Sequence, residues 1–280
     1  MLTNFNAMLD DAHKNGYAVG SFNAYNYETI RGIIEAAKEF GTKSVIVAFG
    51  YKYLDNMELD DVVAVTKTLA ERSGLDVCLH LDHTGDIPTV FQAIRAGFGS
   101  VMYDGSALPF EQNLANTKLI CEVAHASGVS VEAELGSIAA GEQSHEGSAD
   151  DLEVYTSPEQ ARTFVQETGV DALAVSIGTL HGLYKGTPKL RIDILKKINA
   201  ACGIPLVLHG GSGIPEDAIQ ESIKNGISKI NVNTEISVFA IEKIKDKLDG
   251  KTPHLSVLSK TEEEAVKEVV LKYMAFFQTR

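Results

Sequence analysis

Three histidines that lie far apart in the chain each follow a short apolar segment of the kind that forms a buried β-strand. His83 follows Val77–Leu81, His181 follows Ala172–Ser176, and His209 follows Pro205–Leu208. Three imidazoles with one open position form the ligand set of many catalytic zinc ions. One histidine at a strand end more often makes a surface hydrogen bond. Three of them, each ending a different strand, predict a metal site.

Carboxylates and amides stand at corresponding positions after other strands. Asp82 adjoins His83 and is the first candidate for a general acid or base. The alternative is that Asp82 only orients a histidine ligand from a second shell of contacts. The remaining polar residues at strand ends are Asn23, Asp104, Glu134 and the segment Asn231-Val-Asn-Thr234.

A glycine-rich segment, Gly210-Gly-Ser-Gly213, follows the strand that ends at Leu208 and precedes a helical pattern. Bare backbone N–H groups beside a helix N-terminus suit a phosphate group. The alternative is a tight turn that needs glycine for its positive φ. Gly182 and Lys185, just after His181, add a further backbone donor and a positive charge.

Eight short β-rich segments alternate with helical patterns, and they determine how these residues could meet. Runs such as Val-Ile-Val-Ala-Phe are apolar on both faces, as in a parallel sheet covered by helices. Eight such units predict one (β/α)₈ TIM barrel over residues 1–280, whose active site would lie at the C-terminal ends of the strands. The expected strands are Ala18–Asn23, Ser44–Phe49, Val77–Leu81, Ser100–Tyr103, Ser130–Leu135, Ala172–Ser176, Pro205–Leu208 and Lys229–Val232.

The two ends of the chain extend this barrel. The amphipathic leader around Phe5 and Leu9 predicts an N-terminal capping helix, and residues from about Glu262 to Phe277 predict a C-terminal helical extension. A doubly wound open sheet is disfavoured, because its first strand would normally precede a G-x-G-x-x-G turn. Here that strand ends in Gly20-Ser-Phe-Asn23 without such a turn.

Composition excludes several classes of protein. The 280 residues are 44% hydrophobic and 22% charged, enough for a full core, and the net charge is −13. An acidic chain argues against sequence-independent binding to nucleic acid, which needs many lysines and arginines. No apolar run approaches the roughly 18 residues of a membrane span. The three widely spaced cysteines and the absence of a signal peptide predict a cytoplasmic protein.

Five motifs in register resemble the class II ketose-bisphosphate aldolases, and the resemblance covers essentially the whole chain. The family includes fructose-1,6-bisphosphate and tagatose-1,6-bisphosphate aldolases. The motifs are Leu81-Asp82-His83, Glu132-Ala-Glu134-Leu-Gly136, Gly178-Thr-Leu-His181-Gly-Leu-Tyr-Lys185, Leu208-His209-Gly-Gly-Ser-Gly213 and Lys229-Ile-Asn-Val-Asn-Thr234.

The resemblance implies a role for each candidate residue. His83, His181 and His209 would bind Zn²⁺, while Asp104 and Glu134 match an alternative or second metal position. Asp82 would be the proton donor to the aldehyde-derived oxygen, and Glu142 would return a proton to C3 from a loop. Backbone carbonyls near Gly182 and Gly210 match a monovalent-cation (Na⁺ or K⁺) site. The dihydroxyacetone phosphate half would be bound by Gly182, Gly210, Gly211, Ser212, Asn231, Asn233 and Thr234, with Asn23 and Lys185 beside it.

The implied reaction is reversible cleavage of a phosphorylated ketose into dihydroxyacetone phosphate and glyceraldehyde 3-phosphate, by a homodimer or homotetramer. Ala139-Ala140 stand where the family has Gly-Gly, and Gly105-Ser-Ala-Leu-Pro follows Asp104 where many fructose-type members have histidines. These departures concern the aldehyde half of the site. Fructose 1,6-bisphosphate, tagatose 1,6-bisphosphate and other phosphorylated ketoses therefore all stay open as substrates.

Three alternative functions of such a barrel would require different sets of residues. A Schiff-base aldolase needs a lysine near the top of an inner strand, whereas Lys43 and Lys229 are expected at the opposite ends of theirs. A metal-dependent hydrolase would carry H-x-H in its first strand, which is absent. A sugar-phosphate-binding subunit without catalysis would not require Asp82 beside the metal ligands.

Overall fold

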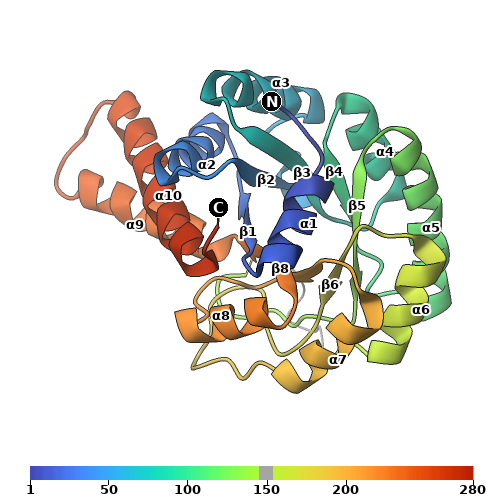
Figure 1. Cartoon of the computed structure of the whole chain (residues 1–280). Coiled ribbons are helices and arrows are strands. Elements are labelled where there is room, and N and C mark those ends of the chain that lie inside the picture. The colour runs from blue at the N-terminus through green and yellow to red at the C-terminus, as the bar shows by residue number, and fades with distance from the viewer. Residues whose placement is uncertain (145–153, 280) are drawn as a thin grey trace.

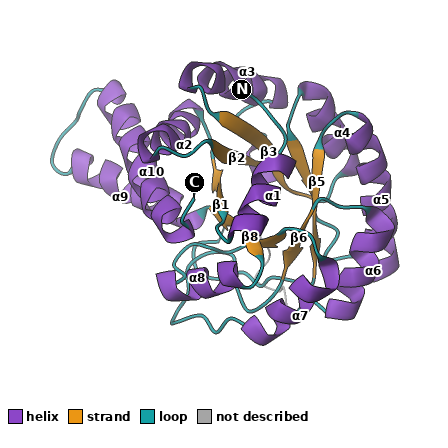
Figure 2. Cartoon of the chain, viewed as in Figure 1, coloured by secondary structure: helices purple, strands orange, loops and turns teal. Residues whose placement is uncertain are grey.

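The eight strands form a closed barrel in a computed structural model that describes residues 1–144 and 154–279. Each strand pairs in parallel with the next one in the sequence, and β8 returns to pair with β1. Helices surround the strands on the outside (Figures 1 and 2). The predicted (β/α)₈ fold is therefore confirmed.

After the first helix, strands alternate with helices, with η1 and α3 together after β2 and α9 and α10 together after β8. None of the described helices is both long and apolar enough to cross a membrane. The strands are β1 (Val19–Asn23), β2 (Ser44–Gly50), β3 (Asp76–Thr84), β4 (Ser100–Tyr103), β5 (Ser130–Leu135), β6 (Ala172–Val175), β7 (Leu206–Leu208) and β8 (Ile227–Val232). The helices are α1 (Asn6–Asn15), α2 (Tyr27–Phe40), η1 (Tyr51–Tyr53), α3 (Leu59–Ser73), α4 (Ile87–Ala96), α5 (Phe110–Ala126), α6 (Pro158–Thr168), α7 (Ile192–Cys202), α8 (Glu216–Lys224), α9 (Thr234–Leu248) and α10 (Leu255–Phe277).

Side chains alternate between the helical layer and the barrel interior, because successive residues of a strand point to opposite faces. In β3, Leu79 and Leu81 pack in the core beneath the helices, whereas Cys78 belongs to a second apolar cluster at one end of the barrel interior. His80 lies above it, fully buried, with Nδ1 2.8 Å from Ser100 Oγ. His80 is therefore a hydrogen-bonded residue of the core.

Helix α1 closes the N-terminal end of the barrel. Phe5, Met8 and Leu9 pack in one cluster with the inward side chains Val19 and Ile46. Figure 1 shows α1 lying across this end of the strands, as the amphipathic leader predicts. This end of the barrel interior is filled with apolar side chains. The polar side chains of the interior therefore lie toward the other end.

Helix α10 takes a place in the outer ring beside β1, with α9 on its far side (Figure 1). Phe277 is fully buried and stacks on Phe22 of β1, with ring centroids 6.4 Å apart. The chain beyond it stays attached, since Thr279 Oγ1 donates to the carbonyl of Ala18. The C-terminal extension therefore packs directly against the barrel as one of its covering helices.

Candidate active site

A bulge near the end of β3 brings two neighbouring residues to the mouth of the barrel. Leu81 pairs with Val101 and Thr84 with Tyr103, so β3 has one residue more than β4 between these pairs. His83 has φ = 47°, in the left-handed region that non-glycine residues rarely occupy. Such strain persists only where surrounding contacts hold it, and it often marks a functional position.

Three histidines converge at this mouth, as the sequence predicts. His83 lies within the bulge of β3, His181 lies in the loop after β6, and His209 follows β7. One nitrogen from each ring lies within 4.8 Å of the other two. His83 Nε2 and His209 Nδ1 are only 2.7 Å apart. The three rings are therefore placed so that they could bind one metal ion together.

The electrostatics of the rings suit a divalent cation. Burial lowers the pKa of His181 well below its usual value and also lowers that of His209, so both rings are neutral and have a lone pair for a metal. His83 Nδ1 lies 2.9 Å from Asp104 Oδ2, which leaves Nε2 facing the other two rings. A carboxylate behind a ligand histidine is the usual arrangement in metal sites.

A second group, made of His83, Asp104 and Glu134, could hold a cation beside the first. Glu134 is buried and its Oε2 has no hydrogen-bond partner. Burial, reinforced by the nearby negative charge of Asp104, raises the pKa of Glu134 well above its ordinary value. A cation at this position would satisfy that carboxylate, so the residues of this second group fit a metal.

Asp82 lies fully buried beside the histidines and is held by two asparagines. Asn23 Nδ2 donates to Oδ2 at 2.9 Å, and Asn231 Nδ2 donates to Oδ1 at 3.1 Å. Burial alone would raise the pKa of Asp82, but its electrostatic interactions with His83, His209 and Lys229 outweigh burial and lower the pKa. Asp82 is therefore an ionised carboxylate in a fixed orientation.

The glycine-rich segment after β7 packs tightly against its neighbours. A Cβ atom on Gly210, whose φ is +68°, would lie 2.1 Å from the carbonyl oxygen of Leu180, and one on Gly211 would lie 2.6 Å from that of Asn231. Ser212 Oγ accepts a hydrogen bond of 3.1 Å from the N–H of Glu235, in the first turn of α9. The segment thus lies against the N-terminus of α9, where backbone N–H groups favour an anion.

We expect Gly210→Ala to lower the free energy of unfolding by about 2–5 kcal/mol, because left-handed strain adds to overpacking. Gly128→Ala is the matched control: its φ is +74°, but a new Cβ would meet nothing within 4 Å. That control should cost only about 1–2 kcal/mol. Urea denaturation of both variants measures the difference. Equal losses would contradict the close approach at Gly210.

The predicted residues Asn233 and Thr234 lie at the start of α9, both buried. The Asn233 side chain donates from Nδ2 to the Tyr53 hydroxyl at 3.1 Å and accepts from the Tyr25 hydroxyl. The rings of Tyr25 and Tyr53 meet edge to face, 4.8 Å apart. These two tyrosines form an aromatic wall on the β1–β2 side, which the sequence analysis did not identify.

Glu142 and Lys185 lie on the rim of the mouth. The loop after β5 pairs through its backbone with the loop after β6, since Glu142 N–H donates to the carbonyl of Leu183 and His181 N–H to that of Ala139. The Glu142 side chain is 57% exposed and lies 3.6 Å from the Lys185 amine. A candidate acid is therefore attached to the loop that carries His181, a candidate metal ligand. The segment 145–153, which contains part of the same loop, lies outside the described residues.

Lys229 lies inside β8 and does not open it, so the expected position of this lysine is wrong. The strand begins two residues earlier, at Ile227. The Lys229 amine is fully buried, 2.8 Å from Glu132 Oε2 and 2.6 Å from Asn231 Oδ1. Side chains two residues apart on a strand share a face, so Lys229 lies on the same face as Asn231, and Glu132 lies on the same face as Glu134. This pattern could have identified the pair from the sequence.

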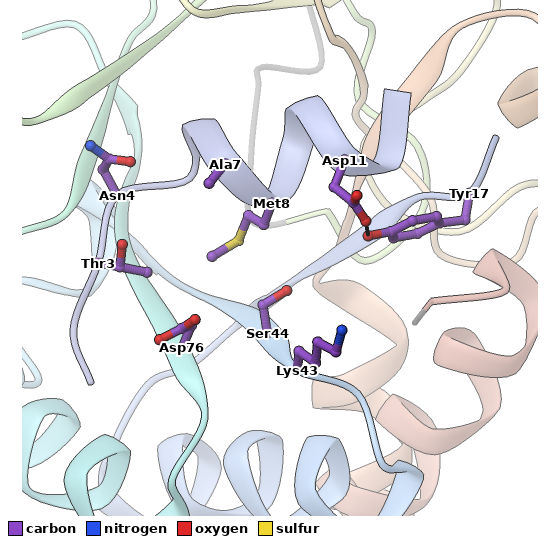
Figure 3. Close-up of a pocket in the computed structure, with 9 residues that line it drawn as sticks. All are labelled: Thr3, Asn4, Ala7, Met8, Asp11, Tyr17, Lys43, Ser44 and Asp76. Atoms are coloured by element: carbon purple, nitrogen blue, oxygen red, sulfur yellow. Dashed lines mark hydrogen bonds between the residues drawn. The ribbon is translucent and has the colours of Figure 1, made fainter. Parts of the chain in front are cut away.

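A separate cavity of about 270 Å³ lies at the opposite end of the barrel. It is bounded by α1 and by the first residues of β2 and β3, Ser44 and Asp76, and Figure 3 shows Tyr17 donating to Asp11 at its edge. Active sites of these barrels lie at the other end, where the histidines converge.

The chain is similar to proteins of one known family. The sequence model of the family described as fructose-bisphosphate aldolase class-II matches residues 3–280. The chain belongs to this family. The family consists of lyases, so the prediction of a class II aldolase is confirmed.

Similar proteins cover nearly the whole chain. A sulfofructosephosphate aldolase of Alkalicoccus urumqiensis is 41% identical over 244 residues, which are 85% of this chain and 82% of that protein. A fructose-bisphosphate aldolase of Staphylococcus aureus is 41% identical over 253 residues, 89% and 87% of the two chains. The crystal structure of the YdjI aldolase from Escherichia coli K12 has a TM-score of 0.88 at 35% identity and covers 100% of this chain and 98% of its own. Two aldolases whose names give different substrates are thus equally similar to this chain, each at 41% identity.

Proposed function

We propose that this class II aldolase reversibly cleaves fructose 1,6-bisphosphate into dihydroxyacetone phosphate and glyceraldehyde 3-phosphate. The observation that carries the proposal is the convergence of three histidines beside a buried, doubly anchored Asp82. A glycine-rich anion site adjoins them at the N-terminus of α9. These are the parts that carbon–carbon cleavage of a phosphorylated ketose requires.

The residues that would hold the metal are His83, His181 and His209, with Asp104 and Glu134 at a second position. Zinc supplies Lewis-acid polarisation of the substrate carbonyl. The neutral histidines keep their lone pairs for it because burial disfavours their charged forms.

Asp82 is proposed to act as the base in the cleavage direction. Its carboxylate takes the proton of the C4 hydroxyl, the C3–C4 bond breaks, and its electrons remain on the fragment that becomes dihydroxyacetone phosphate. Glu142 then delivers a proton to C3 from the rim of the mouth. In the direction of synthesis, Asp82 returns its proton to the aldehyde oxygen, as microscopic reversibility requires.

The dihydroxyacetone phosphate half is proposed to bind to the residues Gly182, Gly210, Gly211, Ser212, Asn231, Asn233 and Thr234. The Gly211 N–H itself donates to the carbonyl of Asn231 at 3.0 Å. Lys185 adds positive charge. A monovalent cation, Na⁺ or K⁺, is proposed at the carbonyls near Gly182 and Gly210; the Tyr184 hydroxyl donates to the Gly210 carbonyl at 2.9 Å. Asn23 and Asn231 are proposed to contact the substrate while they orient Asp82.

The sugar is tested by measuring triose phosphate release from three ketose phosphates in parallel. Fructose 1,6-bisphosphate is expected to give the highest kcat/KM. Tagatose 1,6-bisphosphate differs at C4, which one contact can discriminate by about 10–100-fold. Sulfofructose phosphate belongs in the panel because a relative bears that name. A kcat/KM at least tenfold higher for either alternative would reassign the substrate.

Three further proposals concern the domain organisation, the assembly and the location of the protein. Residues 1–280 are proposed to fold as one domain, which a single cooperative unfolding transition would support. A homodimer or homotetramer is expected, and light scattering measures it. The described cysteines, Cys78, Cys121 and Cys202, are all free, which supports a reducing, cytoplasmic location.

A further inference from the structure

Beneath the three histidines, a buried ion pair crosses the barrel interior. Lys229 from β8 and Glu132 from β5 are both fully buried, and the Lys229 amine lies 2.8 Å from Glu132 Oε2. Desolvation of two charges is costly, so a pair of this kind is weak grounds for stability alone. The pair lies directly behind His209, a candidate metal ligand, and this position indicates a function in the metal site.

The two oxygens of Glu132 have different partners. Oε2 faces Lys229, whereas Oε1 lies 2.9 Å from Nε2 of His209. The Lys229 ammonium group, 2.8 Å from Oε2, pairs with Glu132 as a carboxylate. An ionised carboxylate can only accept hydrogen bonds, so the proton of the neutral His209 ring must be on Nε2. The lone pair is then on Nδ1, the atom that faces His83.

Other polar groups around the pair are compatible with this tautomer. His80 Nε2 is 3.7 Å from Glu132 Oε2 and 3.9 Å from Asp82 Oδ1. Asn231 accepts from Lys229 through Oδ1 and donates from Nδ2 to Asp82 at 3.1 Å. The same Nδ2 is 3.4 Å from His209 Nε2, farther than from Asp82. Glu132 Oε1 is thus the nearest acceptor to His209 Nε2, while His83 Nε2 faces Nδ1 on the other side of the ring.

We propose that Glu132 and Lys229 are positioning residues that fix the tautomer of His209 and thereby set the affinity of the site for its metal. The proposal rests on the proposed role of His209 as a ligand. Lys229 contributes because an ammonium group donates only, so it requires an oxygen opposite it. The pair together determines which atom of residue 132 faces the histidine.

The substitution Glu132→Gln separates this role from simple packing. In that variant Lys229 attracts the amide oxygen, so the amide nitrogen faces His209 Nε2. A donor there favours a lone pair on Nε2 and moves the ring proton to Nδ1, where the metal must bind. We expect Zn²⁺ affinity to fall about 10–100-fold, the usual effect of losing such a supporting contact.

The double variant Glu132→Gln with Lys229→Met provides the rescue. Without the ammonium group, the amide is free to turn its oxygen toward His209, and the ring proton returns to Nε2. We expect the double variant to bind Zn²⁺ more tightly than Glu132→Gln alone, measured by competition with a chromophoric chelator. Glu263→Gln is the matched control, since Glu263 is a buried, ion-paired carboxylate on α10; its Zn²⁺ affinity should equal that of the unmodified chain.

A spectroscopic measurement keeps the proposal testable even if a variant does not fold. Long-range ¹H–¹⁵N correlation of the metal-free, unmodified protein reports the His209 tautomer directly. A proton on Nε2 is expected. A proton on Nδ1, or a double variant no tighter than Glu132→Gln, overturns the proposal. Because neither readout uses a sugar, loss of the proposed aldolase substrate would leave this result unchanged.

Discussion

Asp82→Asn lowers kcat by about 10²–10⁴-fold, the range expected when a general base is removed. The amide retains the size of the carboxylate but cannot take the C4 proton. The variant should still bind Zn²⁺, because Asp82 is not among the three histidine ligands. Steady-state cleavage of fructose 1,6-bisphosphate, with zinc content measured on the same samples, checks this expectation.

The control for this substitution is Asp171→Asn. Asp171, just before β6 at the opposite end of the barrel, is also a hydrogen-bonded carboxylate. Its partners are the Asn6 side chain, His125 and the N–H of Val131. Its kcat should match that of the unmodified chain. If Asp82→Asn turns over within threefold of that chain, Asp82 only orients its neighbours.

Removal of the metal lowers activity by roughly 10³-fold or more, since Lewis-acid stabilisation is worth several kcal/mol. The barrel should remain folded, because its apolar clusters do not involve the ligands. EDTA followed by dialysis removes the ion, and addition of Zn²⁺ restores activity. Circular dichroism before and after the treatment checks the fold.

The matched variant for metal removal is His181→Ala, which deletes one ligand that lies outside the regular strands. Its activity should be low and should not return on addition of Zn²⁺. Full activity of a metal-free sample would exclude the metal mechanism. In that case borohydride trapping with substrate would test a Schiff base at Lys229, the buried lysine of the barrel interior.

The local pattern of the chain was sufficient to predict the barrel and most of its contents. Each of the eight expected strands lies within two residues of a strand in the structure at both ends, apart from β3, which extends three residues further, to Thr84. Runs that are apolar on both faces occur only where helices cover a sheet, and this depends on neighbouring residues alone. The start of α6 is likewise determined by neighbouring residues, because Ser157 is its N-cap and Pro158 its first residue.

For Asp82 and His83 the local pattern was not sufficient to predict where both side chains lie. In a regular strand, adjacent side chains point to opposite faces, so only one of the two could reach the mouth. Both reach it because of the bulge against β4 and the left-handed backbone of His83. A bulge depends on the pairing of two strands and leaves no period in the sequence.

The sequence by itself determined the fold class, the three histidines and the glycine-rich segment, because these depend on residue type and on strand order. Tertiary structure alone decided that Asn23 and Asn231 anchor Asp82, and that Lys229 pairs with Glu132 behind His209. These contacts join residues from strands far apart in the chain. They arise only when the barrel closes and burial obliges each polar group to find a partner.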